Sequence, residues 1–313
     1  MNDVLVVVGG SDKSIDHANC ITFASDKQYF LVGAYKAFFI YRRDHREHLL
    51  KWPVHDGNVV SIISLPKDRI ATGSEDKRII VWTLKLHPLS KPERTAFRQF
   101  TNEITSLETH PLMDSLLFAS FQNGEIIAWN FETDTVVQLR HEGSTIRSLS
   151  ACRNNNFLFA ATNDGSCEVY HLTTFQKATE WQAHVAAINK CLLSPDGTLL
   201  ATCSSDHTAR VWDVTPLNKI VEVAKAAETA EPPPTSPSSP PTKPSSNLPT
   251  VKWKHSLQHS RWVWDCAFSS DAKILITVSS DRLVQLWTEH SPNPVTLLER
   301  QKSAFCVALS EYK

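Results

Sequence analysis

Two features of the sequence predict an all-β protein whose residues 1–313 form a single β-propeller domain. The first is a succession of short runs rich in Val, Ile, Phe and Thr and bounded by Asp, Gly, Asn or Ser, such as "YFLVGA", "RIIVWTL", "FLFAATN" and "LLATCSS". Apolar residues that alternate in this way are typical of half-buried strands, and almost no stretch has helical spacing. The second is a repeat of close to 40 residues, which is the length of one four-stranded propeller blade.

An aromatic residue marks the third strand of each predicted blade. These residues are Tyr41, Trp82, Trp129, Tyr170, Trp212 and Trp287, at intervals of 41, 47, 41, 42 and 75. The last interval contains a Pro/Ser/Thr-rich segment, residues 225–250, and the period survives once this segment is set aside. The segment lacks the apolar area that would offset the entropy of ordering, so we expect a disordered loop between blades.

The two ends of the chain are predicted to share the last blade. Six complete groups of strands are followed by "SAFCVALSEYK", which supplies the first strand of a seventh group, and the N-terminal "VLVVVGG" can supply its neighbours. Such sharing closes a seven-bladed ring and removes exposed sheet edges. Because only fifteen residues separate Val4 from Asn19, we expect three strands in this closing blade instead of four.

Charge and cysteine content exclude several functional classes. The 32 Lys and Arg residues against 33 Asp and Glu residues leave a net charge of −1, which favours neither nucleic-acid binding nor a polybasic membrane surface. The seven cysteines include no Cys-x-x-Cys pair and are interpreted as small buried residues in a reducing compartment. "VLVVVGG" is too short for a signal peptide or a membrane span. We therefore expect a cytoplasmic protein without membrane insertion or homo-oligomer formation.

Histidines and acids recur with the repeat. Each of four groups has an acid six residues before its aromatic and a histidine 21 to 23 residues before the acid: His55, Asp76 and Trp82; His141, Asp164 and Tyr170; His184, Asp206 and Trp212; His259, Asp281 and Trp287. With a nearby Ser or Thr they could form a catalytic triad. A catalytic site is needed once, however, whereas a bond that ties two loops of a blade is needed in every blade. We therefore predict structural tetrads, no enzyme activity and no cofactor or metal site.

These residues resemble the Asp-His-Ser/Thr-Trp tetrad of the WD-repeat family, most fully in "LLATCSSDHTARVWDV". In that family the first strand of a blade has core positions at its first, fourth and sixth residues, here Val263, Cys266 and Phe268. This register puts Trp262 and Trp264 at non-core positions on the rim of the channel.

The same register selects a predicted partner-binding surface on this rim. Trp and Tyr residues are enriched among interface anchors, and an exposed aromatic patch without a partner favours aggregation, although a neighbouring loop could also pack over both tryptophans. The predicted partner-binding residues are Arg261, Trp262, Trp264, Phe305, His17, Asn19, Asn58, Glu103, Thr105, Arg147 and Asn189.

Longer stretches resemble one branch of this family. "LLSPDGTLLATCSSDHTARVW", "RWVWDCAFSSDAKILITVSSDRLVQLW" and "AFCVAL" are similar to the last blades of the small G-protein-β-subunit-like (lethal with sec thirteen protein eight type) component of TOR kinase complexes. The resemblance implies a non-catalytic scaffold that binds and stabilises the kinase catalytic domain and supports nutrient and growth signalling. It also implies larger complexes with raptor-like or rictor-like subunits, and a cytoplasmic protein that reaches endomembranes through the kinase complex.

Two other functions stay open. A substrate receptor or peptide reader of a ubiquitin ligase or chromatin complex would need a charged pocket, and the predicted rim has only scattered charges at Glu103 and Arg147. A propeller enzyme would need a His/Asp cluster in the channel that does not repeat with the blades, and the sequence contains none.

Overall fold

The computed structural model describes residues 4–9, 18–45, 48–217, 251–288, 291–299 and 305–311. Almost all of their regular structure is β-strand, and the one short helical stretch covers residues 215–217. Among these described residues, no helix is long and apolar enough to cross a membrane. The expected loop at 225–250 lies outside the described residues, as does His17.

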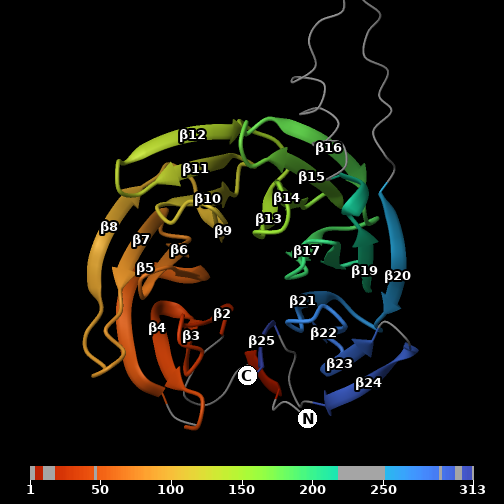
Figure 1. Ribbon diagram of the computed structural model, residues 1–313, viewed down its shortest axis with the longest axis horizontal. Coiled ribbons are helices and arrows are strands. Elements are labelled where there is room, and N and C mark those ends of the chain that lie inside the picture. Colours follow the sequence, from red (N-terminus) through yellow and green to blue (C-terminus); the bar gives the residue numbers. More distant parts are fainter. Residues whose placement is uncertain are drawn as a thin grey trace, which may run out of the picture.

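The strands form antiparallel sheets arranged around a central channel, consistent with a propeller (Figure 1). We call each unit of four consecutive strands a blade. The first two blades share β5, and together they make one seven-stranded sheet. Their strands are β2 (Cys20–Phe23), β3 (Tyr29–Gly33), β4 (Tyr35–Arg42) and β5 (His48–Leu65), followed by β6 (Arg69–Ser74), β7 (Arg78–Thr83) and β8 (Glu93–Gln99).

The next four blades are separate four-stranded sheets. The third contains β9 (Ile104–Thr109), β10 (Leu116–Phe121), β11 (Ile126–Asn130) and β12 (Thr135–Arg140). The fourth contains β13 (Ile146–Ser150), β14 (Phe157–Thr162), β15 (Ser166–His171) and β16 (Lys177–Gln182). The fifth contains β17 (Ile188–Leu193), β18 (Leu199–Ser204), β19 (Thr208–Asp213) and β20 (Lys252–Gln258). Because β19 and β20 pair in this sheet, residues 225–250 connect two strands of one blade, and the expectation that they connect two blades is wrong. The sixth contains β21 (Val263–Phe268), β22 (Ile274–Ser279), β23 (Leu283–Thr288) and β24 (Ser291–Glu299).

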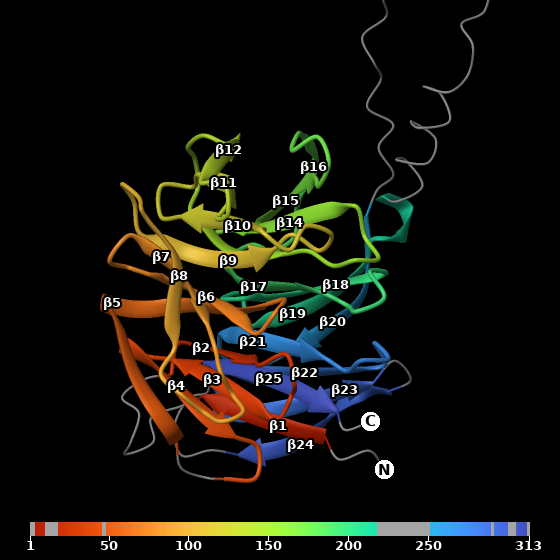
Figure 2. The same cartoon turned by 60° about the vertical axis from the view of Figure 1, so that its left-hand side comes forward.

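The two ends of the chain meet in a smaller sheet. β1 (Val4–Gly9) pairs antiparallel with β25 (Cys306–Glu311), so that Val4 lies opposite Glu311. β25 also contacts the inner strands β2 and β21 of the first and sixth blades (Figures 1 and 2). Within the described residues this sheet has two strands, whereas three were expected, and the chain between Gly9 and Ala18 lies outside those residues.

Apolar packing between neighbouring blades forms the core. The third-strand aromatic of each blade from the second to the sixth packs in one cluster with outer-strand side chains of the preceding blade. The pairs are Trp82 with Trp52, Trp129 with Phe100, Tyr170 with Leu139, Trp212 with Trp181, and Trp287 with Leu257. The repeated aromatic is therefore a contact between blades, which explains why it recurs once per repeat.

Candidate functional site

Three of the four predicted tetrads form hydrogen-bonded networks. In the fifth blade, His184 Nδ1 lies 2.9 Å from Asp206 Oδ2 and His184 Nε2 lies 2.7 Å from Thr202 Oγ1. The indole of Trp212 donates to the same Thr202 oxygen at 2.9 Å. The second blade joins His55, Asp76, Thr72 and Trp82 in this way, and the sixth joins His259, Asp281, Thr277 and Trp287.

Burial and hydrogen bonding act in opposite directions on the pKa values of His55, His259 and Asp206. Burial lowers the pKa of His55 and of His259 although an aspartate lies beside each ring, so the neutral imidazole is favoured. Burial opposes ionisation of Asp206 as well, but hydrogen bonds from His184 and Thr208 outweigh it and hold its pKa well below the usual range. The histidine ring nitrogens are occupied by internal bonds, which is the arrangement of a structural tie.

The expectation for His141 in the fourth blade is wrong. His141 is exposed, and no hydrogen bond in the described part of the chain joins it to Asp164. Asp164 instead accepts bonds from the hydroxyl of Thr162 and the amide of Ser166. The preceding residue, Arg140, takes the inward position, because its guanidinium donates to the carbonyls of Gly124 and Ser144.

An ionic network around the buried Glu168 takes the place of the tetrad in the fourth blade. Arg140 Nε lies 3.1 Å from Glu168 Oε2, and Lys177 Nζ lies 3.1 Å from Glu168 Oε1. The phenol of Tyr170, the third-strand aromatic, donates to Glu168 at 2.6 Å. Sequence reasoning missed this network, although the charged Glu168 inside the otherwise apolar run "CEVYHL" was a possible signal.

The predicted tryptophans form an aromatic patch on the rim. We define this patch as Trp262, Trp264 and Phe305. The Trp262 and Trp264 rings pack edge to face with centroids 5.6 Å apart, and the Trp264 and Phe305 rings do the same at 5.6 Å. Trp262 is 49% exposed and Phe305 is 38% exposed, whereas Trp264 is half-buried and donates to Ser280 Oγ at 2.6 Å. The patch therefore offers apolar ring surface that no described residue covers.

The other predicted rim positions lie around the channel. The cavity there measures about 880 Å³, and it is lined by Trp264 and Phe305 of the patch and by Asn19, Asn58, Glu103, Thr105, Arg147 and Asn189. Arg261 is exposed next to the patch but does not line the cavity, and neither does Trp262. Asn58 and Asn189 are engaged by neighbouring side chains, whereas Arg147 is exposed and directs only its Nε to Asn163.

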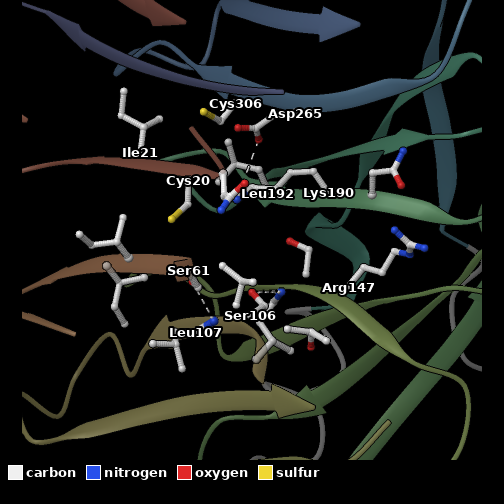
Figure 3. A pocket seen from close by; sticks show the side chains of 18 of the residues that line it. Cys20, Ile21, Ser61, Ser106, Leu107, Arg147, Lys190, Leu192, Asp265 and Cys306 are labelled. Atoms are coloured by element: carbon white, nitrogen blue, oxygen red, sulfur yellow. Dashed lines mark hydrogen bonds and ion pairs between the residues drawn. The ribbon is translucent and has the colours of Figure 1, made fainter. Parts of the chain in front are cut away.

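Three charged groups deeper in the channel were not predicted. Lys190 Nζ lies 3.9 Å from Asp265 Oδ1 on one wall of the cavity, across from Ser61 and Ser106 (Figure 3). Asp265 is only 8% exposed, and burial raises its pKa while Lys190 and two backbone amides oppose that shift. Burial also raises the pKa of the third group, Glu108, to about 7. The only feature of the sequence that indicated these three groups is that each is a charged residue inside an inner-strand run, "ITSLET", "INKCLL" or "VWDCAF".

Within the ranges that the structure describes, no three His, Cys, Asp or Glu side chains gather so as to hold a metal ion. The seven cysteines are free thiols and five of them are buried. Burial raises the pKa of Cys191 to about 12, which keeps this thiol protonated and unreactive. The described geometry has exposed aromatic rings at the rim and a cavity lined by polar and charged side chains beside them.

Comparison with known proteins places these features in a family. Residues 46–83, 134–171, 175–213 and 252–288 match the WD domain, G-beta repeat. The chain is 26% identical over 229 residues to the target of rapamycin complex subunit wat1 of Schizosaccharomyces pombe. The aligned region covers 68% of this chain and 71% of that protein. It is 29% identical over 222 residues to the target of rapamycin complex subunit LST8 of Saccharomyces cerevisiae, covering 66% and 72%. Against the protein LST8 homolog of Dictyostelium discoideum it is 29% identical over 218 residues, covering 66% and 70%.

Proposed function

We propose that this chain, a WD-repeat protein, is a non-catalytic scaffold subunit of TOR kinase complexes that binds and stabilises the kinase catalytic domain. The observation that carries this proposal is the aromatic patch of Trp262, Trp264 and Phe305 in a chain whose relatives are named as target of rapamycin complex subunits. Aromatic side chains gathered at the centre of an interface commonly supply most of its binding energy.

The geometry of the patch supports a protein partner. Its rings lie at the start of two neighbouring strands, since Trp262 immediately precedes β21, Trp264 is the second residue of β21, and Phe305 immediately precedes β25. The indole nitrogen of Trp264 is already occupied by Ser280, so the exposed part of the pair is apolar. An apolar side chain of the kinase would bury these rings, while Arg261 and the polar rim residues would border the contact.

Several finer points belong to the same proposal. We infer a ring of seven blades, of which the last combines β25 and β1 and closes the ring between the first and sixth blades. Larger assemblies would include raptor-like or rictor-like subunits. The protein would act in the cytoplasm and reach endomembranes only through the kinase complex, and residues 225–250 would form a loop between the fifth-blade strands β19 and β20.

The first prediction concerns the patch itself. Replacing Trp262 and Trp264 together with Ala should cost about 2 to 4 kcal/mol of binding free energy and release the kinase. The measurement is co-purification of the TOR kinase with the variant, beside thermal unfolding to show that the fold is intact. Phe97→Ala is the matched control, because Phe97 is 45% exposed on the outer strand β8, away from the rim.

Retention of the kinase by the folded double variant would refute the assignment of this surface. The same pull-down distinguishes the kinase scaffold from the alternative function, a substrate receptor or peptide reader. That function would use the exposed Arg147 at the channel, and mass spectrometry would then identify a ubiquitin-ligase or chromatin subunit instead of a kinase.

A further inference from the structure

Side chains of the inner strands hydrogen-bond each blade to the next around the channel. The amide of Leu107 in the third blade donates to Ser61 Oγ of the second at 3.1 Å. The amide of Leu149 in the fourth blade donates to Ser106 Oγ of the third at 3.2 Å. In both cases the acceptor is the third residue of its inner-strand run, "VVS" or "ITS", and the donor is the fourth residue of the next.

Asp265 occupies the same position in the sixth blade but carries a charge. It is the third residue of "VWD", and its Oδ2 accepts the amide of Val307, the fourth residue of "AFCV", at 2.9 Å. Its other oxygen, Oδ1, accepts the amide of Cys266 at 2.9 Å and lies 3.9 Å from Lys190 Nζ. A carboxylate thus makes the bond that a serine hydroxyl makes between the second and third blades and between the third and fourth, and Lys190 supplies its counter-charge.

This junction also carries the aromatic patch. Trp264 immediately precedes Asp265, and Phe305 lies two residues before Val307. The hydrogen bond between Asp265 and Val307 and the ring contact between Trp264 and Phe305 therefore join the same two strands, β21 and β25. Within the described residues, β25 is backed by one strand, β1, whereas the inner strand of a four-stranded blade is backed by three.

We propose that Asp265 is a positioning residue of the partner-binding surface, which holds β25 through the Val307 amide and so places Phe305 against Trp264. Lys190, whose Nζ lies 3.9 Å from Asp265 Oδ1, favours the ionised form of this carboxylate. Hydrogen bonds to an ionised acceptor are stronger than neutral ones, and this compensates for the narrower sheet behind β25. The inference deepens the proposed function but depends on it only for the identity of the partner.

The test uses the full chain and compares Asp265→Ala with the conservative Asp265→Asn. Asp265→Ala should raise amide hydrogen exchange of residues 305–309 in the free protein by about tenfold, since one charge-assisted hydrogen bond is lost. Asp265→Asn keeps an amide oxygen for the Val307 amide and should restore most of the protection. Ser61→Ala is the matched control, because it removes the equivalent bond to Leu107 at a junction without aromatic residues on its rim; it should leave exchange at 305–309 unchanged.

A double-mutant cycle separates positioning from general stability. Phe305→Ala should change the near-ultraviolet circular dichroism of the tryptophans in the wild-type background, and it should change it little once Asp265→Ala is present. Kinase binding should follow the same rule: each single variant weakens it about tenfold, and the double variant weakens it little further.

Unchanged exchange at 305–309 in Asp265→Ala, or additive effects of the two substitutions, would overturn the positioning role. A wild-type protein that binds no TOR kinase would overturn the proposed function instead, and the exchange and circular dichroism measurements on the free protein would still decide the role of Asp265.

Discussion

His184 and His141 precede the acids of neighbouring repeats at nearly the same distance, but the structure gives them different roles. His184 lies between Asp206 and Thr202 with both ring nitrogens engaged, whereas His141 is exposed. Spacing along the chain could not separate the two cases, because the difference depends on Arg140, whose guanidinium takes the inward place through contacts with other loops.

This difference can be measured as stability. His184→Ala removes the partner of a buried aspartate and a buried threonine, so it should lower the free energy of unfolding by about 1 to 3 kcal/mol. His141→Ala should change it by less than about 0.5 kcal/mol, because no described bond is lost. Urea unfolding curves of both variants provide the comparison, and equal destabilisation would contradict the assignment.

Among the blades, the fourth differs from its neighbours in what holds its strands. Its inner network consists of Arg140, Glu168, Tyr170 and Lys177, and it links the end of β12 in the third blade to β15 and β16 in the fourth. The strands themselves followed from alternating apolar residues and turn signals in the sequence. The ionic link did not, because it joins residues of two blades that only the packing brings together.

The ionic link can be tested by replacing, one at a time, two acids that contact the same lysine. Glu168 is buried and Glu180 is exposed, yet both lie within hydrogen-bonding distance of Lys177 Nζ. Glu168→Ala leaves the guanidinium of Arg140 without its counter-charge, so the variant should lose about 2 to 4 kcal/mol of unfolding free energy. Glu180→Ala, the control, should cost less than about 0.5 kcal/mol. Thermal or urea unfolding would refute the link if the two variants were equally stable.

For the molecule as a whole, the buried titratable groups have opposing effects on stability as pH changes. Burial lowers the pKa of His55 and His259 from 6.5, so the unfolded chain takes up protons first below about 6.5 and acidification destabilises the fold. Burial raises the pKa of Glu108 from 4.5 to about 7, so the folded protein takes up this proton first and acidification stabilises the fold. Asp265, whose pKa is also raised by burial, acts in the same direction as Glu108.

Glu108→Gln removes one of the two stabilising contributions. Between pH 7 and pH 5 the variant should lose about 2 kcal/mol more unfolding free energy than the wild type, since its side chain can no longer take up a proton on acidification. Urea unfolding at several pH values checks the difference. Parallel pH profiles for the two proteins would show that Glu108 does not titrate in this range.

The sequence by itself determined the all-β class, the repeat and the register of the sixth inner strand. Each depends on local properties, since strand-forming residues, turn residues and one aromatic per repeat can all be read along the chain. The register alone placed Trp262 and Trp264 outside the core of their blade, where the structure has one exposed and one half-buried.

Only the tertiary structure decided which long-range partners meet. The bond from Val307 to Asp265, the ion pair with Lys190, and the replacement of one tetrad by Glu168 and Arg140 all join residues of different strands or blades. Such contacts depend on how far each blade rotates against the next and on which side chain fills the space between them. Buried charges must find partners across those junctions, and their identity emerges only when the sheets are packed around the channel.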